Sequence, residues 1–250
     1  MQKPKFILGL IIILTISFIG FQAFGLDISS EAARFPIIPL LTYYYVATTY
    51  DTRSYFFKFL FLYAIGELLG GVGMIYYLTE SVYIDYLQFY GGNFCYILAY
   101  ICLFLEVYKN LDLRKVIKRF PVHIIILLAL DIYSVIFVSE VAVKSGFLQG
   151  PLDSVIEVIY NIVIMMLLTI TLINYISRDS KKAMNLLVGA LCIVFSEVIQ
   201  VAYFYISERA ILGITYSALL VFAFCFFYLQ SGMAYSKARN YRTLEKLEEA

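Results

Sequence analysis

The sequence predicts an all-α fold, an integral membrane bundle of eight transmembrane helices, and three observations lead to this class. The 250 residues are 62% hydrophobic, whereas a soluble domain is about 45–50% apolar. Mean hydropathy is +0.84. The apolar residues come in long runs, and a helix needs about 20 such residues to cross a bilayer. Basic residues gather in alternate connections between these runs.

Eight apolar runs can be read along the chain, and together they form one predicted domain over residues 1–235. The runs cover residues 6–24, 35–49, 55–78, 86–108, 121–139, 152–176, 184–206 and 210–235. The first run is too long for a typical signal peptide and has a poor cleavage site, which favours a retained helix over a cleaved one. The charged segment 236–250 is predicted to be a cytoplasmic tail.

The distribution of basic residues predicts the orientation of the bundle. Most of the 19 Lys and Arg residues fall on one side of the eight runs, with the densest group in the connection that follows residue 108. Because cytoplasmic connections are enriched in Lys and Arg, we expect both termini in the cytoplasm and the bundle in the inner (plasma) membrane. The bilayer is the expected partner. With a formal net charge of +1 and no basic patch outside the connections, no nucleic acid is expected.

Two glutamates stand near the middle of apolar runs, and any function must account for them. Glu67 lies in the third run and Glu197 in the seventh. A charged group at that depth costs at least about 2.5–3.5 kcal/mol, so such side chains usually face a bundle interior or a wet cavity. We therefore expect Glu67 and Glu197 to be catalytic carboxyl groups in one cavity. The alternative is a pair of protonated glutamates that hold helices together by hydrogen bonds.

Other polar residues in the runs are candidates to line the same cavity and bind a substrate: Asn93, Tyr100, Asp131, Asn161, Ser196 and Gln200. Asp153 and Glu157 stand near the start of the sixth run, where an acidic side chain is expected to be solvated and to favour the helix dipole. Gly66 and Gly70 have the spacing that lets another helix approach closely.

The composition also excludes several classes of site. The four cysteines lie in apolar segments without CxxC spacing, so buried free thiols are expected. A single histidine is too few for a zinc hydrolase with several histidine ligands. Retinal proteins need a lysine in the middle of a helix, and this sequence has none there. We therefore expect no metal and no cofactor.

The order of these features resembles the YhhN-like lysoplasmalogenase family of multi-pass membrane proteins. The resemblance rests on Gly66-Glu67-Leu68-Leu69 in the third run and on Gly189-Ala190-Leu191 with Phe195-Ser196-Glu197 in the seventh. It covers most of the chain from about residue 55. The motif aspartates of the family stand here as glutamates. Ala99-Tyr100 stands where members often have Ala-His, so this chain is identified as a divergent member.

The resemblance implies a membrane lipid hydrolase that cleaves the vinyl ether bond of lyso ether phospholipids, with a lysophospholipid-like amphiphile as its partner. One carboxyl group would protonate the vinyl ether and the other would stabilise the cation and activate water, as in glycosidases. Glu67, with apolar neighbours, is expected to be the acid. Glu197, beside Ser196 and Gln200, is expected to be the base. A non-catalytic protein, a lipid-binding protein or a small-molecule transporter on the same scaffold stays the alternative.

Overall fold

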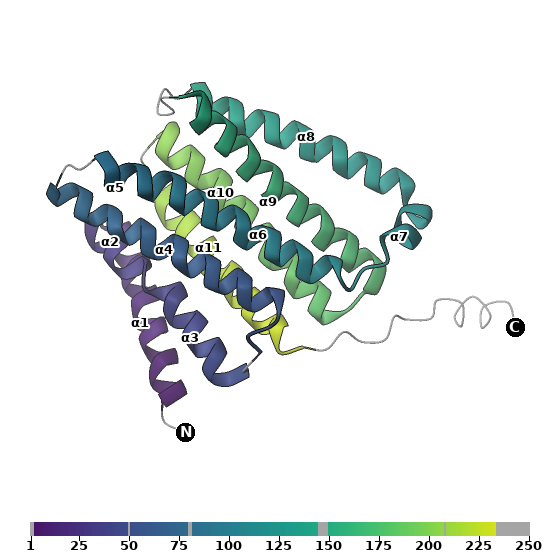
Figure 1. Cartoon of the computed structure of the whole chain (residues 1–250), viewed down its shortest axis with the longest axis horizontal. Helices are drawn as coiled ribbons and strands as arrows, with labels where there is room; N and C mark the ends of the chain where they lie inside the picture. Colours follow the sequence, from purple (N-terminus) through teal and green to yellow (C-terminus); the bar gives the residue numbers. More distant parts are fainter. Residues whose placement is uncertain (1–2, 50, 80–81, 145–149, 208, 234–250) are drawn as a thin grey trace, which may run out of the picture.

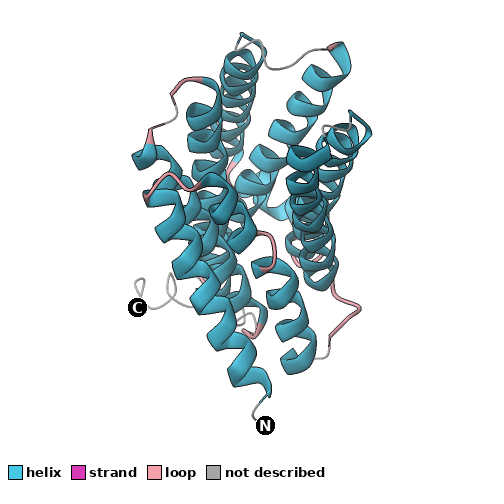
Figure 2. Ribbon diagram, turned by 90° about the vertical axis from the view of Figure 1, so that its left-hand side faces the viewer, coloured by secondary structure: helices cyan, strands magenta, loops and turns pink. Residues whose placement is uncertain are grey.

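The computed structural model describes residues 3–49, 51–79, 82–144, 150–207 and 209–233, and these residues form helices without any strand (Figure 2). The first half of the chain contains α1 (Lys3–Ala23), α2 (Asp27–Arg34), α3 (Ile37–Thr49), α4 (Tyr55–Thr79), α5 (Val82–Tyr86), the π-helix η1 (Leu87–Gly91) and α6 (Gly92–Tyr108). The second half contains α7 (Leu113–Arg119), α8 (Pro121–Lys144), α9 (Pro151–Arg178), α10 (Lys181–Tyr205) and α11 (Ala210–Ser231). The predicted tail, 236–250, lies outside the described residues.

Seven helical segments of the described chain are long and apolar enough to cross a membrane. They lie in α1, in α4, in η1 with α6, and in α8, α9, α10 and α11. The chain is thus an all-helical multi-pass membrane protein, and the predicted runs agree with these helices to within a few residues at most ends. The largest difference is at α8, which continues to Lys144 rather than ending near residue 139.

The helix in the predicted second run is too short to cross a membrane by itself. Its helix, α3, has 13 residues, a length of about 20 Å at 1.5 Å per residue, against a hydrocarbon core of about 30 Å. The residues between the first and second predicted runs form the short helix α2. Pro36 separates the two helices, because proline lacks the N–H that a continuous helix would use.

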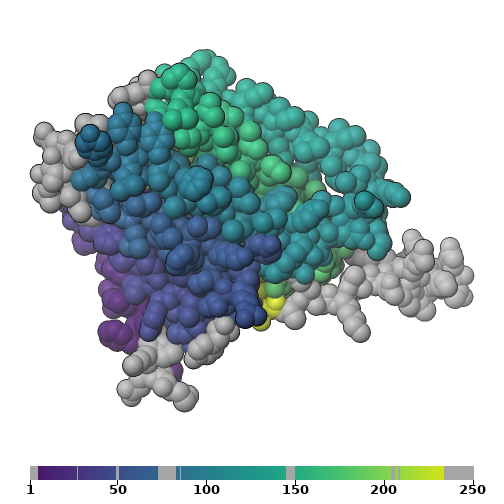
Figure 3. All heavy atoms as spheres, viewed as in Figure 1, coloured from purple at the N-terminus to yellow at the C-terminus, as the bar shows by residue number. Residues whose placement is uncertain are grey.

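Long helices that are neighbours in the chain pack as antiparallel pairs (Figure 1). These pairs are α4 with α6, α8 with α9 and α10 with α11. α9 also packs against α6 and α10, and α1 packs against α3 and α11, so the pairs join into one bundle. α8 is the outermost helix and packs mainly against α9. On the face in Figure 3, segments from α3 to α8 form most of the surface.

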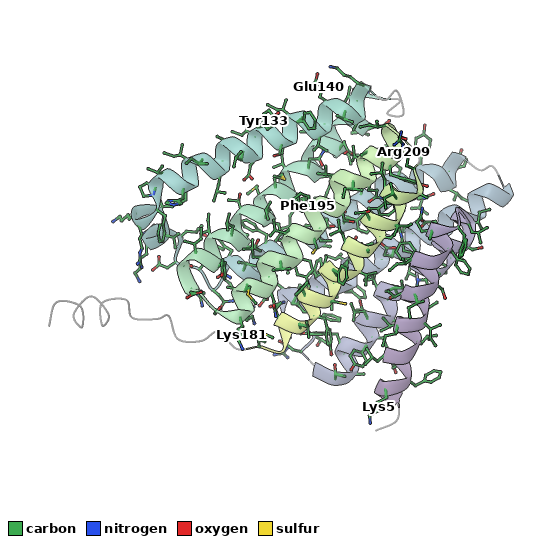
Figure 4. All side chains as sticks on the ribbon, turned by 180° about the vertical axis from the view of Figure 1, so that it is seen from behind. Lys5, Tyr133, Glu140, Lys181, Phe195 and Arg209 are labelled. Atoms are coloured by element: carbon green, nitrogen blue, oxygen red, sulfur yellow. The ribbon has the colours of Figure 1, made fainter. Side chains whose placement is uncertain are left out.

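Four labelled residues mark the two ends of the bundle. Lys5 and Lys181 lie at one end, and Glu140 and Arg209 lie at the other (Figure 4). Phe195 lies between these ends on α10, with 55% of its side chain exposed on the apolar surface. Glu197, two residues further on, is therefore placed near the middle of the bundle.

An aromatic cluster joins α4, α6 and α11 in the core. The ring of Phe59 lies 5.6 Å from those of Phe224 and Phe227, and the ring of Tyr63 lies 4.7 Å from that of Phe224. Gly189 makes this packing possible, because a Cβ there would lie 2.5 Å from the Phe227 ring. Tyr63 and Phe59 lie one and two turns before Glu67 on α4, so the cluster packs next to that buried residue. Of the four free cysteines, three are half-buried and Cys225 is exposed, so the prediction that all are buried was wrong.

Candidate functional site

A cavity of about 180 Å³ lies inside the bundle, and both intramembrane glutamates line it. The lining comes from α2, α4, η1, α6, α9, α10 and α11, so it draws on both halves of the chain. Among the predicted site residues, five line this cavity: Glu67, Asn93, Asn161, Glu197 and Gln200. The expectation that Glu67 and Glu197 face a shared cavity is confirmed.

Glu67 is held at both carboxyl oxygens. Nε of Arg34 donates to Oε2 at 3.2 Å, and the hydroxyl of Tyr96 donates to Oε1 at 3.1 Å. Only 2% of Glu67 is exposed. The opposite charge of the guanidinium and the second hydrogen bond offset the free-energy cost of removing the Glu67 carboxylate from water. The expectation that Glu67 has only apolar neighbours was wrong, because α2 brings Arg34 back onto α4.

Gly66 determines how Tyr96 reaches Glu67. A Cβ at residue 66 would lie 2.6 Å from the Tyr96 ring, so only glycine lets this ring lie flat on α4. At Gly70 a Cβ would meet nothing within 4 Å. The Gly66/Gly70 spacing was expected to let a helix approach at both positions, but the close contact with α6 is made at Gly66 alone.

Glu197 has a different environment from Glu67. Its Oε1 accepts a hydrogen bond of 3.3 Å from the hydroxyl of Tyr100, which is fully buried behind the cavity wall. Gln200 lies one turn along α10 and lines the cavity beside it. No salt bridge to Glu197 occurs within the described part of the chain. The hydrogen bond that Glu197 accepts therefore comes from a neutral group, the hydroxyl of Tyr100.

Glu157 is a third carboxyl group in the cavity. The side-chain amide of Asn161 donates to its Oε1 at 3.2 Å and to Oγ of Ser139 on α8 at 3.2 Å. The prediction of a solvated helix start was wrong for Glu157. Asp153 does stand at the start of α9, where it accepts a hydrogen bond from the backbone N–H of Gly150, and it also accepts one from the hydroxyl of Tyr90.

Three predicted site residues do not line the cavity. Tyr100 contacts Glu197 from behind, as described. Asp131 accepts a hydrogen bond of 2.6 Å from Thr169, because α8 packs outside α9 and its inner face meets that helix. Ser196 donates to the carbonyl of Tyr216 at 2.8 Å, since its position on α10 is rotated about 100° from Glu197, toward α11. Ser196 therefore does not support the charge of Glu197.

The structure adds lining residues that sequence reasoning missed: Arg34, Tyr63, Phe89, Tyr96, Glu157, Tyr160, Val201 and Leu220. Arg34 is the most important of them, and it lies 33 positions before its partner Glu67. One signal narrows the candidates without identifying Arg34. A charged side chain deep in a membrane helix often pairs with an opposite charge, and few basic residues belong to the connections on that side of the bundle.

The cavity contains three carboxyl groups and one guanidinium, surrounded by tyrosine rings. One carboxylate is neutralised by Arg34, so two carboxyl groups share the cavity without a cationic partner of their own among the described residues. Carboxylates that share an apolar cavity repel one another when both are charged. The arrangement can hold one fixed carboxylate and one proton-carrying carboxyl group. No three described His, Cys, Asp or Glu side chains are grouped as a metal site would need.

Comparison of the chain with protein-family models, with curated proteins and with solved structures found no match.

Proposed function

We propose that this protein is a lysoplasmalogenase-like membrane lipid hydrolase, a divergent member of the YhhN-like family. The observation that supports the proposal is the cavity in which Glu67 and Glu197 meet inside the bundle. The two glutamates come from the two motifs on which the family resemblance rests. In this account α2 and α3 together complete an eighth crossing, which leaves both termini in the cytoplasm and the bundle in the inner membrane.

We assign the roles of the two glutamates from their environments, and this assignment reverses the one expected from sequence. Glu197 is the general acid, because its hydrogen-bond donor Tyr100 is neutral and Glu157 lies in the same cavity. Glu67 is the fixed carboxylate, because Arg34 balances its charge. General acid catalysis by a positioned carboxyl group contributes about 10²–10⁴-fold to a rate.

The first two steps of the reaction form a hemiacetal, and protons and atoms balance in both. Glu197 gives its proton to the β-carbon of the vinyl ether, and the double bond becomes an oxocarbenium ion next to the Glu67 carboxylate. Water then adds to the cationic carbon, and Glu67 takes the proton that this water releases. The product of these steps is a hemiacetal.

The hemiacetal next breaks at the bond between its carbon and the ether oxygen. Glu67 returns its proton to the departing oxygen, and Glu197 takes the proton of the hemiacetal hydroxyl. The products are a fatty aldehyde and the glycerol-linked headgroup with a free hydroxyl. Both glutamates are back in their starting states, so the cycle needs water as its one co-substrate.

A second candidate, a lipid-binding protein without catalysis, is favoured by one observation. Both oxygens of Glu67 already accept hydrogen bonds, from Arg34 and from Tyr96. A carboxylate held in this way can serve to anchor helices and need not meet a water molecule. In that case the cavity binds an amphiphile and releases it unchanged.

The experiment that separates the two candidates is an aldehyde assay on purified protein. A lyso vinyl-ether phospholipid is the substrate, and its saturated-ether analogue is the control lipid. The hydrolase releases aldehyde from the first lipid alone, and Glu197→Gln and Glu67→Gln each reduce the rate by about 10²-fold or more while the protein stays folded. Binding of both lipids without aldehyde would establish the second candidate instead.

A further inference from the structure

A second hollow lies on the side of the bundle between α1, α3 and α11. It is a groove of about 230 Å³, lined almost entirely by apolar side chains. Along α1 its lining extends from Leu8 to Phe18, which is about 15 Å at the rise of a helix. Two of its rim residues, Ile12 and Ile16, are 51% and 66% exposed, so the groove opens sideways to the membrane.

The groove meets the polar cavity at one end. Arg34, Glu67 and Leu220 line both hollows. The ion pair between Arg34 and Glu67 therefore lies at the boundary between the apolar groove and the polar cavity. At the opposite end of the groove the rings of Tyr44 and Tyr228 lie 5.6 Å apart. The groove is therefore an apolar hollow that joins the polar cavity at Arg34 and Glu67.

The dimensions of the groove indicate what can fill it. Its lining follows α1 for about 15 Å and is almost entirely apolar, except at the end where Arg34 and Glu67 stand. An extended hydrocarbon chain with a polar end matches this pattern, because its methylenes meet apolar side chains and its polar end meets the ion pair.

We propose that this groove holds the hydrocarbon chain of a single-chain amphiphile whose polar end lies in the cavity of Glu67 and Glu197. The chemical class of the ligand, a lyso ether phospholipid, rests on the proposed function. In such a lipid the vinyl ether joins the hydrocarbon chain to the glycerol. With the chain in the groove and the headgroup in the cavity, that bond lies at the junction, beside Glu67.

A binding experiment tests this placement independently of catalysis. The protein contains no tryptophan, so one introduced tryptophan is a single fluorescent reporter. Ile12→Trp places the reporter on the groove rim, and Ile13→Trp places it about 100° further round α1, with 62% exposure and outside the groove lining. The probe is a saturated-ether lysophospholipid with bromine atoms along its hexadecyl chain, which quenches nearby tryptophan and cannot be hydrolysed.

The expected result is saturable quenching that is several-fold stronger for Ile12→Trp than for Ile13→Trp at equal probe concentration in the same detergent. Excess unbrominated lipid should reverse it. Equal, non-saturable quenching at both positions would overturn the groove as a chain site, whatever the aldehyde assay shows. Saturable quenching without aldehyde release would support the groove and overturn the hydrolase. If Ile12→Trp does not fold, Leu8→Trp reports from the same groove, and the same two readouts apply.

Discussion

Among single residues, Arg34 and Glu67 form the ion pair on which the site geometry depends. The pair links α2 to α4 with Glu67 2% exposed, whereas the pair between Lys144 and Glu140 lies at the surface. The cost of a polar side chain within an apolar run was sufficient to predict that Glu67, Glu197, Gln200 and Asn161 face the interior. It could not predict Arg34, because a charged residue between apolar runs carries no pattern that indicates a distant partner.

Removal of Arg34 should be strongly destabilising. Arg34→Met leaves the Glu67 carboxylate buried without its cation, and breaking such a pair costs about 3–5 kcal/mol. The midpoint of thermal unfolding in detergent should fall clearly for Arg34→Met, recover in Arg34→Met/Glu67→Gln, and stay almost unchanged in Lys144→Met. An Arg34→Met protein as stable as the parent would contradict the ion pair described here.

At the scale of elements, the approach of α6 to α4 places Tyr96 on Glu67. Gly66 is in contact with the Tyr96 ring, and Gly70 faces open space. Sequence alone suggested equal roles for the two glycines, since spacing shows which residues share a face but not where a neighbouring helix touches it. The side chains of α6 decide this, and only the packed structure contains that information.

The two glycines form a matched pair for mutagenesis. Gly66→Ala forces the Tyr96 ring away from α4 and weakens its hydrogen bond to Glu67, so aldehyde release and thermal stability should both fall. Gly70→Ala should leave both unchanged or raise stability slightly, because alanine favours a helix over glycine by up to about 1 kcal/mol. Equal losses in the two variants would mean that the contact at Gly66 does not matter for the site.

At the scale of the whole molecule, hydropathy predicted the class of fold and most of the helix ends. It overestimated the second run, because α2 and α3 divide the crossing between a short amphipathic helix and a helix of 13 residues. The break is useful to the site, since it brings Arg34 down to the level of Glu67.

The predicted orientation places the two ends of the bundle on opposite sides of the membrane. Reporter fusions at Lys115 and Lys181 should read as cytoplasmic, and fusions at Lys144 and Arg209 should read as external. Lys181 and Arg209 lie at opposite ends (Figure 4). If the reporters at Lys115 and Lys144 read from the same side, α8 would not cross the membrane and the orientation would be wrong.

The most direct test of the two-glutamate mechanism is the fate of the transferred proton. Hydrolysis of the lyso vinyl-ether lipid in heavy water, with the aldehyde reduced at once to an alcohol, should place a single deuterium on the carbon next to the former carbonyl carbon. This label must arrive there because the exchangeable carboxyl group of Glu197 protonates the β-carbon, and Glu197→Gln should abolish its formation. Aldehyde that lacks deuterium at that carbon, or an unimpaired Glu197→Gln protein, would contradict the mechanism.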